Sequence, residues 1–159
     1  MKKFLPTYTG CILCGDKKRN PFSLGLKFYV TDDGVESKIV IPYQYQGYEG
    51  VVHGGITSAL LDEAIGWAVA VSRKRYFVTA ELNVRFVKPL LTDQKIAIRA
   101  KAINHKGLIS LGEGEIIDEK GIVLASGKAK FFLLDKEKSR DVDSYLSYGD
   151  EDLSFLDDF

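Results

Sequence analysis

The stretch from Ile56 to Val71 constrains the fold most, because apolar or small residues occupy every face of the helix it would form. Its only formal charges are the adjacent acids Asp62 and Glu63. A helix at the protein surface shows a polar stripe, so the pattern predicts a helix enclosed by protein on nearly all sides. The apolar run is too short for a membrane span, and two acids near its middle would be costly in lipid. We interpret Val51–Ala70 as one helix that ends near residues 72–76.

Strand patterns surround this helix. Leu24–Val30 and Val35–Ile41 read as two strands joined by an Asp-Gly turn. After the helix the period changes to two, and strands are expected near 78–86, 95–102, 108–117 and 123–133. Short links force neighbouring strands to be antiparallel. The expected architecture is an α+β fold, a curved antiparallel sheet wrapped around one long central helix. Three glycines within strand patterns indicate bends or close approach of the helix: Gly112, Gly114 and Gly127.

Three regions are expected along the 159 residues. Residues 1–22 read as an irregular arm, 23–135 as the domain, and 136–159 as an acidic tail with partial disorder or a loose surface helix. Residues 43–50 read as a loop. The segment from Asp135 to the end contains nine acidic and three basic residues. Because the formal net charge of the whole chain is zero, the rest of the chain is moderately basic. That balance suits an anionic ligand better than duplex nucleic acid. The start lacks an apolar core long enough for a signal peptide, which predicts a cytoplasmic protein.

Cys11 and Cys14 are the only cysteines and form a Cys-x-x-Cys pair. The plainest interpretation is two reduced thiols. A zinc site normally needs four ligands, and the chain has no second Cys-x-x-Cys or His pair. We therefore predict no metal site within one chain, and a zinc site shared between subunits stays open. A thioredoxin-like redox pair would need a preceding strand and a following helix, which the flanking prolines do not fit.

The element order and one motif resemble the hotdog-fold acyl-CoA thioesterases, in the branch of the phenylacetate-pathway and 4-hydroxybenzoyl-CoA thioesterases. The motif is His53-Gly54-Gly55, followed after six residues by Asp62. The likeness spans roughly residues 24–134 and includes the later run Val78–Phe86 with the following Lys88-Pro89 step. The resemblance implies hydrolysis of an acyl-CoA by a cytoplasmic homodimer or homotetramer. It implies no cofactor, and no nucleic-acid or membrane partner is expected.

The resemblance also assigns roles. Gly54, with Gly55, would offer backbone N–H groups to the oxyanion at the mouth of the helix, where the helix dipole also favours negative charge. Asp62 of the other subunit would be nucleophile or general base, and burial among apolar groups should raise its pKa. Either feature has a plainer alternative: a glycine pair needed only for a tight helix entry, or a buried acid satisfied by a protein partner.

Four further positions complete the predicted site. Glu63 lies about 100° around the helix from Asp62, so it is expected to support the site or contact another subunit, with catalytic acid as a less favoured role. Thr79 falls where the family often carries a residue that holds the attacking water, although an outward-facing strand threonine is as good an interpretation. His53 is expected to cap the helix. Candidates for substrate binding are Gln46, Gly47, Arg85 and Lys88.

Two rivals remain open. A hydratase or dehydratase of the same fold would place a catalytic histidine differently, so Asp62 argues against it. A non-catalytic acyl-CoA-binding module is supported by Gly47, because several relatives carry Asn or Gln at that position. Acyl-chain identity cannot be predicted from these residues.

Overall fold

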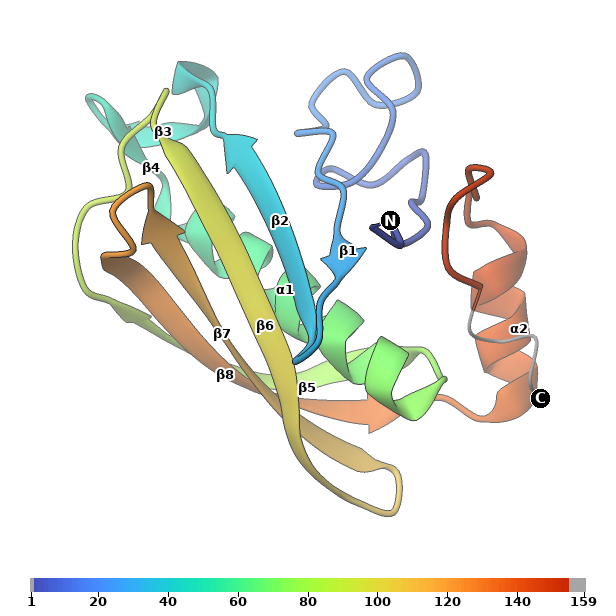
Figure 1. The fold of residues 1–159 in the computed structure, drawn as a ribbon. Helices are drawn as coiled ribbons and strands as arrows, with labels where there is room; N and C mark the ends of the chain where they lie inside the picture. Colours follow the sequence, from blue (N-terminus) through green and yellow to red (C-terminus); the bar gives the residue numbers. More distant parts are fainter. Residues whose placement is uncertain (1, 155–159) are drawn as a thin grey trace.

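A computed structural model describes residues 2–154 of the chain. Within them, six antiparallel strands form one curved sheet around a long helix, α1 (Gly54–Arg73), which lies along the inner face of the sheet (Figure 1). The predicted architecture is therefore confirmed. The strand order is β1-β2-β6-β7-β8-β5. The strands are β1 (Tyr29–Val30), β2 (Val35–Val40), β5 (Phe77–Phe86), β6 (Lys95–Lys106), β7 (Ile109–Asp118) and β8 (Val123–Leu133).

Glycines in the sheet allow α1 to pack closely against it. A methyl group at Gly112 would lie 2.5 Å from Ile65 Cγ2 of α1, and one at Gly114 would lie 3.0 Å from Ile65 Cγ1. Real carbon atoms rarely approach that closely, so the helix sits where a side chain on these strands would have been. The expected close approach of the helix is confirmed. By length and composition alone α1 would also pass as a membrane span, a test that enclosed core helices pass as well.

The segment before α1 differs from the prediction. Residues 43–50 are not a simple loop: a 3-10 turn, η1 (Tyr43–Tyr45), leads into a small hairpin of β3 (Gln46–Tyr48) and β4 (Val51–Val52). The helix accordingly begins at Gly54 and not at Val51. Val52 is already committed to strand pairing, and its N–H also donates to the carbonyl of Leu90. Val51 and Val52 continue the apolar pattern of the helix, but their hydrogen bonds to β3 and Leu90 hold them in an extended conformation.

The first predicted strand, Leu24–Val30, is mostly not part of the sheet. Only Tyr29 and Val30 pair with β2. The N–H groups of Leu24 and Leu26 donate instead to carbonyls of the N-terminal arm, at Ile12 and Leu13. These N–H groups therefore bond to the arm and are not available for pairing with a strand of the sheet.

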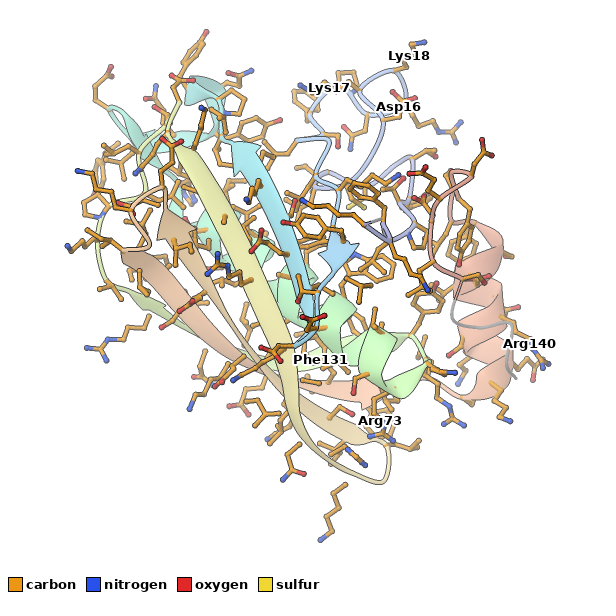
Figure 2. All side chains as sticks on the ribbon, viewed as in Figure 1. Asp16, Lys17, Lys18, Arg73, Phe131 and Arg140 are labelled. Carbon is orange, nitrogen blue, oxygen red and sulfur yellow. The ribbon has the colours of Figure 1, made fainter. Side chains whose placement is uncertain are left out.

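The tail forms a firmer element than predicted. α2 (Lys136–Ser144) lies beside the N-terminal arm (Figure 1). The fully buried Ser139 hydroxyl accepts a hydrogen bond from the N–H of Tyr76, and the Tyr76 hydroxyl donates to Asp143 at 2.8 Å. The arm's tip, with Asp16, Lys17 and Lys18, projects away from the sheet (Figure 2). The rest of the tail prediction, residues 155–159, lies outside the described residues.

Candidate active site

At the entrance of α1, the N–H of Gly55 is capped and that of Gly54 is open. His53 is the N-cap, and its Nδ1 accepts a hydrogen bond from the N–H of Gly55 at 2.9 Å. Gly55 is therefore not free to act as the second oxyanion donor that we predicted. Within residues 2–154 no protein acceptor takes the N–H of Gly54. It is one of the donors that the first turn of every helix leaves unpaired.

Gly54 also has room around it. A methyl group built there would come no closer than 3.5 Å to any atom of its own chain, and the nearest atoms belong to the ring of Phe86. Ordinary packing thus does not demand glycine at this position. An open, glycine-borne N–H at a helix N-terminus is a suitable place for a carbonyl oxygen that becomes an anion. Sequence reasoning missed Phe86 as a neighbour of this donor, because nothing local ties the two segments together.

Asp62 lies two turns farther along α1 and is half-buried. Its Oδ1 accepts a hydrogen bond from the hydroxyl of Thr79 on β5 at 2.9 Å. Burial raises the pKa of Asp62 above its usual value, and the Thr79 hydrogen bond opposes this by stabilising the carboxylate. Asp62 is thus a carboxylate of enhanced basicity with one oxygen held in place, which suits a general base or nucleophile.

A β-bulge explains how Thr79 reaches Asp62. Thr79 pairs with Phe131 of β8, but Glu81 pairs with Lys130, so Ala80 is an extra residue on β5. Simple alternation predicts Thr79 outward and Val78 inward, and both assignments are wrong. Thr79 faces α1, whereas Val78 is 52% exposed. Bulges of this kind re-aim side chains and are frequent beside active sites.

The Asp62 carboxylate and the Gly54 N–H of one chain cannot both reach the carbonyl group of one substrate molecule. Gly54 and Asp62 are eight residues apart on a regular helix, which corresponds to about 12 Å along its axis. A nucleophile and an oxyanion donor must both lie about 3 Å from the reacting group. Each chain therefore presents two separated halves of a possible site.

The two predicted substrate residues before the helix have structural contacts. Gln46 Oε1 accepts a hydrogen bond from the N–H of Gly50 and so stabilises the β3–β4 turn. A methyl group at Gly47 would lie 3.1 Å from His53 Cδ2, tighter than normal contact. Gly47 therefore packs closely against the cap residue His53.

The predicted cationic residues lie away from Asp62 of their own chain. Arg85 pairs with Ser126 and alternates with the inward-facing Val84, so its side chain points to the outer face of the sheet. It lines a broad groove there together with residues of both charges, including Arg99, Lys101, Glu113 and Lys128. The sheet separates this groove from α1. Lys88 follows β5 and is exposed.

Glu63 points to a different part of the molecule from Asp62. Its carboxylate accepts a hydrogen bond from Trp67 Nε1 at 3.3 Å and lies with the sulfur atoms of Cys11 and Cys14 of its own chain. Burial, followed by the charge of Cys11, raises the pKa of Glu63 to about 7. The structure thus places Glu63 against the arm, away from β5 and from the half-site around Asp62.

Comparison with known proteins agrees with the fold. Residues 49–125 match the family model of the thioesterase superfamily. A thioesterase superfamily protein of solved structure superposes with a TM-score of 0.71 at 23% identity, covering 78% of this chain and 60% of its own. The PaaI protein of E. coli, from the phenylacetic acid degradation operon, gives a TM-score of 0.64 at 18% identity, covering 70% of this chain and 81% of its own.

Two relatives are more similar in sequence. A Bacillus halodurans protein solved with CoA is 31% identical, with a TM-score of 0.57, and covers 62% of this chain and 66% of its own. An uncharacterized protein of Schizosaccharomyces pombe is 30% identical over 91 residues, which are 55% of this chain and 52% of that protein. The chain thus spans about half the length of this curated relative. Its fold is the hotdog fold, and its segment 49–125, with the helix entrance and Asp62, matches the thioesterase superfamily.

Proposed function

We propose that the protein hydrolyses an acyl-CoA thioester to a carboxylic acid and CoA, at a site shared by two copies of the chain. The observation that carries the proposal is the separation of two complementary halves. One is the open N–H of Gly54, and the other is the basic carboxylate of Asp62 held by Thr79. The superfamily match and the CoA bound by the Bacillus halodurans relative support the choice of substrate.

The edge strand β5 offers a way to join the halves. It is the last strand of the sheet, and most of its ten residues are exposed, so its outer edge is open to pairing. Antiparallel pairing with a second β5, about a two-fold axis through Asn83 and with Ala80 as the extra residue of each strand, would set Thr79 opposite the partner copy's residue 86. Directly opposed residues share a face of the sheet, and Thr79 and Phe86 both face the helix side.

This pairing would bring Asp62 of one copy to the helix entrance of the other, because Thr79 contacts Asp62 and Phe86 neighbours Gly54. Each two-fold pairing would create two equivalent sites. A homodimer, alone or within a tetramer, is therefore part of the proposal.

The chemistry follows from the two halves. As a general base, Asp62 takes a proton from water, and the resulting hydroxide attacks the thioester carbon; as a nucleophile, its carboxylate attacks directly, and water then hydrolyses the mixed anhydride. In both routes the carbonyl oxygen gains the negative charge, and the Gly54 N–H stabilises it. Collapse breaks the C–S bond, and the CoA thiolate leaves and takes up a proton. Lys88, which is exposed just after β5, remains a candidate for holding the phosphates of CoA, whereas Arg85 points to the outer face of the sheet.

Two variants test the roles separately. Asp62→Asn removes the base while keeping the shape. Gly54→Pro removes the N–H at the first helical position, where proline is well tolerated, and the extended backbone of His53 (φ −57°, ψ 137°) suits a following proline. Loss of one oxyanion donor should lower turnover by about 10²–10³-fold. Gly54→Ala keeps the N–H and should lose clearly less.

Mixing the two variants tests whether the site is shared. In a mixed dimer, one site combines an intact Gly54 from the Asp62→Asn chain with an intact Asp62 from the Gly54→Pro chain. Random exchange of subunits should therefore restore about a quarter of wild-type thiol release, since half of the dimers are mixed and each has one working site. No recovery after verified exchange would contradict a shared site.

The same assays separate the enzyme from a binding module. Thiol release from a panel of acyl-CoAs, measured on the wild type and on Asp62→Asn, should be fast only for the wild type. Saturable acyl-CoA binding without release would favour the non-catalytic module. Release that survives Asp62→Asn unchanged would refute the assignment of Asp62.

A further inference from the structure

The Cys-x-x-Cys turn of the N-terminal arm meets Glu63 of α1. One sulfur from each of Cys11 and Cys14 and one carboxylate oxygen of Glu63 all lie within 4.8 Å of one another. Cys14 is buried, and both cysteines are free thiols. The three groups come from two elements that are about fifty residues apart in sequence. Sequence reasoning missed this cluster because it counted only cysteine and histidine as partners for the pair.

The turn is arranged as a metal-binding loop. The N–H groups of Leu13 and Cys14 both point at Cys11 Sγ, at 3.3 and 3.5 Å, and the N–H of Gly15 donates to the carbonyl of Cys11 at 3.0 Å. Hydrogen bonds from two successive N–H groups stabilise a thiolate at Cys11. Accordingly the hydrogen bond with Cys14 and these N–H groups lower the pKa of Cys11 to about 6, although burial opposes them.

The cluster brings three potential anions together with no protein cation among them. No contact of these three groups with an Arg or Lys side chain is found within residues 2–154. A bound divalent cation would remove this repulsion and let all three groups ionise.

We propose that Cys11, Cys14 and Glu63 bind one zinc ion within a single chain, with water as the fourth ligand. Thiolate and carboxylate are both zinc ligands, and three protein ligands plus one water make a tetrahedral site. The Trp67 N–H holds the Glu63 carboxylate from outside the cluster, as groups around metal ligands commonly do. The ion would fasten the arm to α1, one residue from Asp62. The proposal goes beyond thioester hydrolysis and does not depend on it.

The test is metal binding by the full chain. Protein purified under reducing conditions and stripped with a chelator is titrated with Zn²⁺, and with Co²⁺ as a coloured substitute whose absorption reports thiolate ligation and tetrahedral geometry. We expect one ion per chain. Glu63→Gln, which can still accept from Trp67, should weaken binding by at least about tenfold, because even changes outside the ligand set cost 10–100-fold. Cys14→Ser should weaken cobalt binding and reduce the thiolate absorption, because it removes one of the two sulfur ligands.

Controls make each outcome decisive. Glu113→Gln replaces a glutamate that pairs with Lys101 on the outer face, and it should bind zinc like the wild type. Zinc should also raise the melting temperature of the wild type more than that of Glu63→Gln, because a ligand that binds only the folded state stabilises it in proportion to its affinity. The proposal is overturned if the stripped, reduced wild type shows no thiolate-to-cobalt absorption, if Glu63→Gln binds as tightly as the wild type, or if the cysteines form a disulfide that zinc does not prevent.

Discussion

Replacing Gly112 by alanine tests whether the strand glycines set the height of α1 above the sheet. Gly112 is buried on β7, and its backbone lies outside the left-handed region, so alanine is not strained by the backbone itself. The added methyl would meet Ile65 Cγ2 at 2.5 Å, whereas carbon atoms in contact prefer about 3.5–4.0 Å. Relief requires Ile65 or the helix to move by roughly 1 Å in a packed core.

The expected cost follows from two opposing effects. Overpacking of this kind costs about 1–3 kcal/mol. Replacing glycine by alanine at a compatible backbone position raises the free energy of unfolding by about 0.4–1 kcal/mol, because alanine lowers the conformational entropy of the unfolded chain. The net loss of about 1–2 kcal/mol corresponds to a fall in melting temperature of roughly 3–6 °C for a chain of this size. Thermal and urea unfolding of the wild type and the variant measure it.

Gly127→Ala is the matched control. Gly127 is also buried beneath Ile65, but its methyl would lie 3.4 Å from Ile65 Cδ1, an ordinary contact, so this variant should be neutral or slightly stabilised. In an Ile65→Ala background, which removes the clashing Cγ2, Gly112→Ala should cost clearly less, and the remaining cost comes from the Lys101 carbonyl oxygen 3.1 Å from the added methyl. Equal losses for both glycines, or the same loss with and without Ile65, would refute the packing argument.

Three further outcomes are expected. Thr79→Val removes a hydrogen bond that stabilises the Asp62 carboxylate, so the pKa of Asp62 rises and the acidic limb of the kcat/KM profile should move to higher pH, with Thr79→Ser restoring it. An unmoved limb would separate Thr79 from the base. His53→Ala removes the cap on Gly55 and should cost about 1 kcal/mol in urea unfolding. Lys74→Gly should raise stability by about 1 kcal/mol, because Lys74 ends α1 with a φ of 52°, a conformation that costs other residues more than glycine; an unchanged unfolding midpoint would count against this.

The sequence alone predicts the architecture, which the structure confirms, and it proposes Gly54 and Asp62 as candidate site residues, whose roles stay predictions. An apolar helix with no polar stripe must be enclosed, and strands with short links must be antiparallel, so one curved sheet around one helix was nearly the only solution. The spacing of Gly54 and Asp62 on that helix also follows from helix geometry, and it already separates the two by about 12 Å. Such features depend on residues that are close along the chain.

Only the tertiary structure decided which side chains meet. The bulge at Ala80 turns Thr79 toward Asp62, and no local pattern shows it, because a bulge is defined by the register of two paired strands. The capture of the Gly55 N–H by His53 depends on the backbone at the helix entrance. The meeting of Cys11 and Cys14 with Glu63 depends on how the arm folds over α1, since contacts between distant segments are set by the packing of the whole chain.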